Sequence, residues 1–234
     1  KANLVDAALR DLRWLGLSWE EGPDIGGSFG PYTQSERTIT YENAWQKLLA
    51  DGYIYPCTRS RKELRLYTKS QGVNSEDPLY PLEWRPDDKV FHSDAPGGEV
   101  AWRFRVPEHR KITFIDGCLG ERSFETYLDF GDFLIWRRDG IPAYELAVVV
   151  DDIAMKVTEV VRGEDLLVST ARQILLYEAL GQVPPFFFHC PLLLDMDGQK
   201  LSKSFGSRSI QDHRENSVDP CEWSVAFTDF YQSL

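Results

Sequence analysis

The chain has 234 residues, of which 26 are basic and 37 acidic, and its formal net charge is −11. Hydrophobic residues make up 42% of the chain and aromatic residues 13%, which is enough apolar surface to form a core and excludes a wholly disordered protein. The length suits one large domain or one domain with an insertion. The acidic excess argues against a nucleic-acid binder that is basic all over its surface, but it does not exclude a local basic groove.

The four cysteines are Cys57, Cys118, Cys190 and Cys221. They are too few and too far apart for a disulfide framework, so we expect a protein of the reducing cytoplasm. No two of them have metal-ligand spacing, and no apolar stretch approaches the about 20 residues of a membrane helix, so we expect no membrane association. The chain opens on Lys1 within a helical pattern and without a signal peptide, which indicates that it is cut into rather than naturally started.

Two helices and a strand are expected in the first part of the chain. Apolar residues at helical spacing predict a first helix that ends near Leu15. A second helix would be capped by Thr33 or Ser35 and would end at Gly52, a residue suited to the left-handed conformation of a helix C-terminus. Its apolar face consists of Tyr41, Trp45, Leu48 and Leu49. A short buried strand is expected at residues 53–55.

The segment from Cys57 to about Phe130 has the composition of an insertion. Charged residues, Pro and Gly dominate its first half, where a short helix is expected around residues 64–69. Alternation with period two then predicts a strand over residues 100–106, with residues 112–116 as its hairpin partner. The insertion is therefore expected to mix helix and strand.

Strands and helices alternate after residue 130. The expected elements are a strand over 133–136, a turn at 139–140, a helix over 170–180 that ends at Gly181, and a strand over 186–189. This alternation predicts an α/β core. The adjacent carboxylates of Asp151 and Asp152 suggest a metal or acid/base site, but neighbours in a strand point to opposite faces, so we interpret the pair as structural.

Two lysines three residues apart occur in the segment from Lys200 to Ser204. On a loop, their ammonium groups could reach successive phosphates and stabilise charge on a pyrophosphate leaving group. An isolated motif of this length is more often a solvated loop. Here it follows the blocks 143–152, 159–165 and 169–173, and these segments in this order resemble the C-terminal half of the catalytic domain of class I glutamyl-type aminoacyl-tRNA synthetases.

The resemblance extends to segments 12–19, 32–37 and 55–60, and so covers nearly the whole chain to about Ser209. It implies a Rossmann-like α/β catalytic domain with an inserted α+β subdomain. The domains implied are the rest of the N-terminal half of the catalytic domain (1–56), the insertion (57–130), the C-terminal half with the lysine motif (131–209) and a helical tail (210–234).

The same resemblance assigns roles to particular residues. It implies an ATP-binding motif formed by Lys200, Ser202, Lys203 and Ser204, in which Lys203 and Lys200 act in catalysis and Mg²⁺ accompanies ATP. Arg162 would hold a carboxylate of the substrate L-glutamate, and the hydroxyl of Tyr144 would bind the same ligand. A planar guanidinium suits a carboxylate better than an ammonium does. Without the resemblance, Arg162 would be interpreted as a surface residue and Tyr144 as a core residue.

Three features favour the branch of the family that attaches glutamate to queuosine in tRNA(Asp). Residues 77–85 and 131–147 are similar to that branch, as is the serine after Lys203. Only about 30 residues follow Ser204, whereas members that charge tRNA(Glu) continue into an anticodon-binding region. We therefore expect tRNA(Asp) as partner and a monomer. The alternatives are a catalytic fragment that charges tRNA(Glu) and a non-catalytic relative that binds tRNA.

The zinc ligands of the family are replaced in this sequence. Two cysteines in Cys-x-Cys, a Tyr and a later Cys correspond here to Cys57, Arg59, Tyr80 and Trp84. A guanidinium and an indole cannot bind Zn²⁺, so we predict that zinc is absent. Arg59 and Trp84 are expected to stack instead, as a metal-free cation–π pair.

The first ATP motif of the family, of the form His-x-Gly-His, has no counterpart in this sequence, nor does the first βα unit of about 30 residues. We therefore expect either that an N-terminal segment is missing or that the chain as given cannot activate glutamate. Two basic clusters could contact tRNA phosphates, although charge alone equally fits a solvated surface. They consist of Arg59, Arg61, Lys62 and Arg65, and of Arg103, Arg105, Arg110 and Lys111.

Overall fold

The computed structural model describes residues 4–72, 78–88, 91–93, 95–192, 210–216 and 219–220. The chain divides into two compact units, Pro31–Pro191 and a unit formed by Lys1–Gly30 with Leu192–Leu234. In the second unit, α1 (Leu4–Trp14) contacts α6 (Ile210–Glu215), and Arg214 forms an ion pair with Asp11 at 3.0 Å. The candidate site described below lies in the unit Pro31–Pro191.

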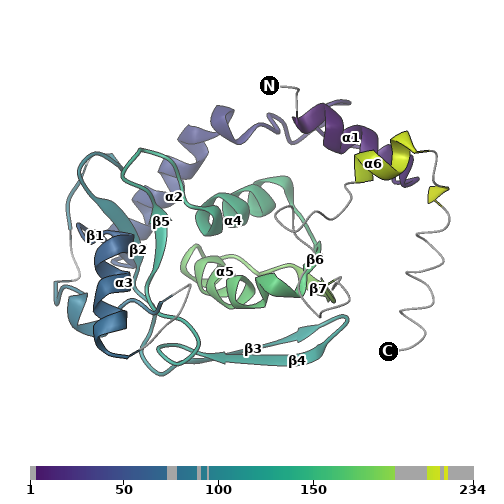
Figure 1. The fold of residues 1–234 in the computed structure, drawn as a ribbon. Coiled ribbons are helices and arrows are strands. Elements are labelled where there is room, and N and C mark those ends of the chain that lie inside the picture. Colours follow the sequence, from purple (N-terminus) through teal and green to yellow (C-terminus); the bar gives the residue numbers. More distant parts are fainter. Residues whose placement is uncertain are drawn as a thin grey trace. The chain divides into compact units, whose positions relative to one another are not determined.

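Two sheets form the framework of the unit Pro31–Pro191 (Figure 1). The first is antiparallel, with the order β1-β2-β5, and consists of β1 (Ile54–Cys57), β2 (Ala101–Phe104) and β5 (Phe133–Trp136). The second has the order β4-β3-β7-β6 and consists of β3 (Lys111–Asp116), β4 (Gly120–Glu125), β6 (Glu159–Gly163) and β7 (Phe186–Cys190). In this second sheet β7 is parallel to both β3 and β6, and only the β3–β4 pair is antiparallel.

Four α-helices accompany the sheets: α2 (Thr38–Ala50), α3 (Arg61–Ser70), α4 (Tyr144–Met155) and α5 (Leu167–Ala179). Short 3₁₀ turns occur at Gln34–Glu36, Leu82–Trp84 and Glu164–Leu166. Helices α4 and α5 pack against each other, and α5 also contacts β3 (Figure 1). Because α5 connects the parallel strands β6 and β7, these three elements form a βαβ unit, as expected for an α/β core.

One large apolar cluster joins the helices to both sheets. Its fully buried members include Trp45, Leu48, Trp136, Leu146 and Leu176. The predicted apolar face of α2 is confirmed, since all four of its residues are buried. Gly52 has φ 74° after the helix, as predicted, but the predicted cap is wrong: α2 starts after Arg37, and no side chain caps it.

The predicted hairpin between residues 100–106 and 112–116 is wrong. Strand β2 pairs with β1 and β5, whereas β3 pairs with β4 across a turn at residues 117–119. Strand β4 carries mostly polar and glycine residues, so it lacks the apolar alternation by which strands are recognised. The hairpin prediction therefore joined two strands that are neighbours in sequence but lie in different sheets.

Asp151 and Asp152 were expected in a strand, but they lie in helix α4. The run of valines before them is compatible with either structure, because short apolar runs do not distinguish a strand from a buried helix. Cys57, Cys118 and Cys190 are free thiols. Among the described residues, no helix has the length and apolar character required to span a bilayer.

Candidate active site

Three adjacent parallel strands carry polar residues at their C-terminal ends. Asp116 is the last residue of β3, while Arg162 and His189 are next to last in β6 and β7 and are paired in register. In open α/β sheets, ligands bind beyond the carboxyl ends of the strands. This edge of the second sheet is therefore the candidate site, and it contains one of the two predicted glutamate-binding residues.

Arg162 is held by side chains from two neighbouring elements. Its Nη2 donates to Thr170 Oγ1 at 2.6 Å and to Gln173 Oε1 at 2.8 Å, both on α5, and its Nε donates to His189 Nε2 at 3.2 Å. The guanidinium carbon also lies 5.4 Å from the centre of the Phe187 ring. These contacts exclude the interpretation of Arg162 as a surface residue at a strand end.

One nitrogen of Arg162 remains available. No hydrogen bond joins Nη1 to any residue in the described part of the chain, whereas Nε and Nη2 are both engaged. A carboxylate is the natural partner for two N–H groups on a fixed guanidinium. The arrangement can therefore bind an anionic ligand through Nη1.

Glu145 continues this network towards α4. Its carboxylate accepts hydrogen bonds from Ser169 Oγ at 2.9 Å and from Gln173 Nε2 at 2.8 Å, and Arg172 lies 3.8 Å away. Burial raises the pKa of Glu145 above its usual value, although these donors oppose the rise. Gln173 thus links Arg162 to Glu145, the neighbour of Tyr144 in sequence.

Tyr144 is the first residue of α4 and is 51% exposed, so it is not a core residue. It lines a pocket of about 420 Å³, together with Arg61, Arg65 and Arg172. Its hydroxyl has no hydrogen-bond partner among the described residues, which leaves it free for a ligand. Arg162 does not line this pocket. The two predicted glutamate-binding residues are connected only indirectly, from Arg162 through Gln173 to Glu145, the residue next to Tyr144.

The predicted ATP-binding residues Lys200, Ser202, Lys203 and Ser204 lie outside the described residues, as does most of the predicted tail. Their roles stay predictions.

The positions of the family's zinc ligands lie close together but do not suit zinc. Cys57 Sγ lies 3.3 Å from Tyr80 Oη, and burial together with this contact raises the pKa of the phenol. The guanidinium carbon of Arg59 lies 4.8 Å from the centre of the Trp84 ring, so the predicted cation–π pair is confirmed. With one thiol and one neutral phenol, this donor set does not fit a structural zinc site.

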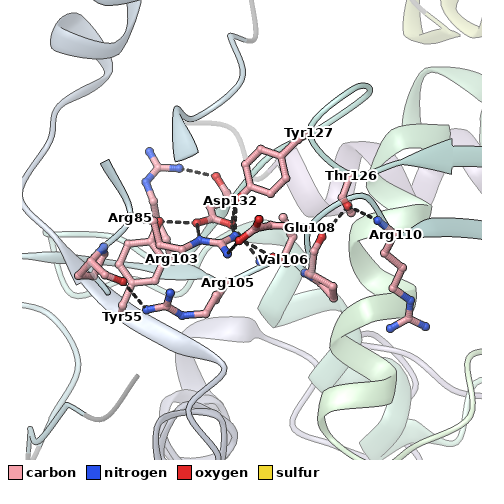
Figure 2. A network of polar contacts seen from close by, with 12 residues as sticks. Tyr55, Arg85, Arg103, Arg105, Val106, Glu108, Arg110, Thr126, Tyr127 and Asp132 are labelled. Carbon is pink, nitrogen blue, oxygen red and sulfur yellow. Dashed lines mark hydrogen bonds and ion pairs between the residues drawn. The ribbon is translucent and has the colours of Figure 1, made fainter. Parts of the chain in front are cut away.

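A second polar cluster surrounds Asp132 and connects the insertion to the first sheet (Figure 2). The buried carboxylate accepts hydrogen bonds from Tyr55 Oη at 2.6 Å, Tyr127 Oη at 2.8 Å and Val106 N at 2.9 Å. Arg85 donates to the same carboxylate through both Nε and Nη2. Such a fully bonded ion pair has a structural role, because no acceptor or donor remains for a ligand.

The predicted basic cluster around residues 103–111 is only partly exposed. Arg103 is buried and donates to Asp132 O, and Arg105 donates to the backbone oxygens of Pro86 and Asp88 (the Asp132 region is shown in Figure 2). Arg110 pairs with Glu178 at 2.8 Å. Arg103 and Arg105 are therefore engaged within the fold, whereas Arg110 and Lys111 are exposed, and contact of this cluster with tRNA phosphates stays a prediction. In the other cluster, Arg61, Lys62 and Arg65 are exposed on α3.

The carboxylates of Asp151 and Asp152 do not form a joint site. Asp151 accepts hydrogen bonds from Arg37 at 2.6 Å and from Tyr41 at 2.9 Å, whereas Asp152 accepts one from Tyr177 at 3.2 Å. Burial raises the pKa of Asp152. No group of three potential metal-ligating side chains occurs in the ranges that the structure describes. The pair links α4 to its neighbouring elements, as the structural interpretation predicted.

The residues that surround Arg162 were not predicted from the sequence. Asp116 is the last and His189 the next-to-last residue of a strand rich in apolar residues, and a polar residue at such a place is the signal that could have identified them. Thr170 and Gln173 lie on the same face of α5, three residues apart.

The comparisons with known proteins agree on one family. Residues 1–226 match the family described as tRNA synthetases class I (E and Q), catalytic domain. A glutamyl-Q tRNA(Asp) synthetase of Symbiobacterium thermophilum is 45% identical over 94% of this chain and 68% of its own length. A glutamate–tRNA ligase of Carboxydothermus hydrogenoformans is 42% identical over 91% of this chain but 44% of its own length.

Solved structures agree with the sequence relatives. The crystal structure of the glutamate–tRNA synthetase of Elizabethkingia anophelis matches with a TM-score of 0.77 at 28% identity, over 94% of this chain and 50% of that chain. The Rossmann-like α/β fold expected from the sequence is thereby confirmed. The chain therefore belongs to the class I aminoacyl-tRNA synthetase family of glutamate and glutamine enzymes and carries its catalytic domain.

Proposed function

We propose that the protein activates L-glutamate with ATP and transfers the glutamyl group to tRNA, with queuosine of tRNA(Asp) as the acceptor. The observation that carries the proposal is Arg162, which lies at the carboxyl ends of parallel strands with Nη1 unengaged. Its position and charge suit a carboxylate of glutamate. Tyr144 adds a free hydroxyl on the neighbouring helix.

The first step forms glutamyl-adenylate. A carboxylate oxygen of glutamate attacks the α-phosphorus of ATP, a new P–O bond forms, and the bond to pyrophosphate breaks. Lys203 and Lys200, with Ser202 and Ser204, would bind the phosphates and stabilise the charge that develops on pyrophosphate, and Mg²⁺ bound with ATP would supply further positive charge there. In the second step, a hydroxyl of the acceptor attacks the activated carbonyl, an ester forms and AMP leaves.

The choice of acceptor rests on sequence. Residues 77–85 and 131–147 are similar to the queuosine-directed branch, and a second relative, the glutamyl-Q tRNA(Asp) synthetase of Nitratidesulfovibrio vulgaris, is 43% identical over 92% of this chain. The glutamate–tRNA ligases are 39–44% identical, so tRNA(Glu) is the second candidate. We propose a monomer that works without zinc.

Two assays test the proposal on the full-length protein. Glutamate-dependent exchange between ATP and pyrophosphate measures activation, and glutamine in place of glutamate is the control. Charging is then measured with tRNA(Asp) that contains queuosine, tRNA(Asp) that lacks it, and tRNA(Glu). We expect exchange with glutamate and charging of the first tRNA alone. Charging of tRNA(Glu) alone would replace the proposed acceptor, and tRNA binding without exchange would indicate a non-catalytic relative.

A further inference from the structure

A buried aspartate–histidine pair contacts Arg162 on the side of its Nε. The side chains of Asp116 and His189 are both fully buried, and His189 Nδ1 lies 2.6 Å from Asp116 Oδ2. The backbone N–H of His189 also donates to the same carboxylate, at 3.1 Å from Oδ2. The pair is thus fixed between two adjacent parallel strands, β3 and β7.

Asp116 is held as an anion. Burial by itself would raise its pKa, but hydrogen bonds from the His189 ring and from the backbone amides of Leu119, His189 and Cys118 outweigh that effect and lower the pKa below its usual value. The amides of Cys118 and Leu119 lie 3.0 and 2.9 Å from Oδ1. The carboxylate therefore offers the histidine ring a fixed acceptor.

The contacts of the ring favour one tautomer. Two groups contact His189 Nε2: Thr170 Oγ1 at 2.9 Å, a hydroxyl that can donate or accept, and Arg162 Nε at 3.2 Å, which can only donate. An Nε2 that accepts satisfies both contacts, whereas a proton on Nε2 would face the N–H of Arg162. The ring proton then resides on Nδ1 and is donated to Asp116. Asp116 thus selects the form of His189 that can bind Arg162.

The contacts of Arg162 in turn fix the direction of its free nitrogen. A guanidinium is planar and rigid, so engaging Nε with His189 and Nη2 with Thr170 and Gln173 leaves no freedom to Nη1. The two N–H groups of Nη1 are thereby oriented before any ligand arrives. Such preorganisation strengthens binding because the ordering cost is already met in the free protein.

We infer that Asp116 and His189 are positioning residues for glutamate: through the hydrogen bond from Arg162 Nε to His189 Nε2, they orient Nη1 of Arg162 towards the substrate carboxylate. The inference rests on the proposed role of Arg162 in binding glutamate. It adds two residues that act through Arg162 and do not touch the ligand.

Two amide substitutions at His189 separate this role from a purely structural one. In His189→Asn, the amide nitrogen replaces Nδ1 and keeps the bond to Asp116, but no acceptor faces Arg162. In His189→Gln, the amide oxygen can replace Nε2 and accept from Arg162. We expect the Kd for glutamate, measured by calorimetry on the full-length protein, to rise about tenfold or more in His189→Asn and less than about threefold in His189→Gln. The Kd for ATP should be unchanged in both.

The variant Arg162→Ala shows whether a negative result contradicts the positioning role of His189 or the proposed role of Arg162 in binding glutamate. If Arg162→Ala leaves glutamate binding unchanged, the proposed function of Arg162 fails. If Arg162→Ala weakens binding but His189→Asn does not, only the inference is overturned. Equal losses in the two His189 variants, with equally lowered melting temperatures, would show a structural role and would also overturn it.

The tautomer of His189 can also be measured by NMR on the unaltered protein, so this test does not depend on whether a variant folds. The ¹⁵N shifts of the His189 ring report its tautomer directly, and we expect a neutral ring protonated at Nδ1. A coupling between Arg162 Nε and His189 Nε2 across the hydrogen bond is expected in the same spectra. A proton on Nε2 would contradict the inference whatever the binding data show.

Discussion

The guanidinium of Arg59 stacks on the Trp84 ring, and these are two of the positions to which the family resemblance assigns zinc-binding cysteines. Tyr80 lies edge-on to the same indole, with ring centres 5.6 Å apart, and contacts Cys57. The four positions thus lie close together, and their side chains are suited to stacking rather than to metal binding. This relationship leads to the first prediction.

The insertion should be insensitive to chelators. We expect that EDTA leaves the melting temperature of the protein unchanged and that elemental analysis finds no stoichiometric zinc. The double variant Arg59→Cys/Trp84→Cys restores the family's ligand set and should bind about one zinc ion per chain. Arg59→Cys alone is the matched control and should bind none tightly. Stoichiometric zinc in the unaltered protein would refute the prediction.

Removal of the Asp132 carboxylate should destabilise the protein strongly. Asp132→Ala removes the buried counter-charge of Arg85 and leaves it only the exposed carboxylate of Glu108, 3.6 Å away, which we expect to cost about 3 kcal/mol in the free energy of unfolding. The matched control is Asp139→Ala, which breaks the exposed pair with Arg137 and should cost less than about 1 kcal/mol. Urea unfolding measures both. Equal losses in the two variants would contradict the structural role of Asp132.

Asp116 should contribute to a loss of stability, measured as the free energy of unfolding, at low pH. Because its pKa in the folded protein lies below the value of an unfolded chain, its contribution to stability is complete above that unfolded value, about 4, and is lost as the pH falls further. We expect the free energy of unfolding to decrease less steeply below about pH 4 in Asp116→Asn than in the unaltered protein. Asp139→Asn, at an exposed site, should keep the original slope.

Tyr144 should contribute to glutamate affinity through its hydroxyl alone. Tyr144→Phe keeps the ring at the start of α4 and removes one hydrogen bond, so the KM for glutamate should rise about three- to tenfold with little change in the KM for ATP. Tyr53→Phe is the control, because Tyr53 stacks on Phe104 and does not line the pocket that Tyr144 lines. An unchanged KM in Tyr144→Phe would remove Tyr144 from the proposed site.

Lys203 should act on the chemical step. Lys203→Ala removes a cation from the developing pyrophosphate charge, and we expect the rate of glutamate-dependent exchange to fall about 10²–10³-fold. The KM for glutamate should change little. Lys47→Ala, which removes an exposed lysine paired with Asp51 on α2, should leave the exchange rate unchanged.

Local sequence patterns predicted individual helices and strands better than they predicted which strands pair with each other. The apolar face of α2 and the conformation of Gly52 follow from helical spacing and from the special backbone freedom of glycine, both of which are local properties. The pairing of β2 with β5 depends on contacts between residues about 30 positions apart, for example Phe104 and Phe133. No local signal specifies that pairing.

The candidate site was predicted only where a resemblance named its residues. Arg162 and Tyr144 were found in this way, whereas His189 and Asp116 carry no motif and become recognisable only when β3, β6 and β7 lie side by side. For Arg103 and Arg105, both interpretations offered by the sequence, a surface that contacts tRNA and a solvated surface, placed the side chains in solvent. Their neighbours in space, and not in sequence, determine that they are internal.

The carboxylate of Asp132 accepts hydrogen bonds from residues within the insertion and from a residue that precedes it. Tyr55 precedes the insertion, Arg85 and Val106 lie within it, and Asp132 follows it. A segment bound in this way to both of its flanks cannot open alone without breaking a buried ion pair. We therefore expect the amide of Val106 to exchange its hydrogen with solvent only when the whole unit unfolds, so that the insertion and the first sheet behave as one cooperative folding unit.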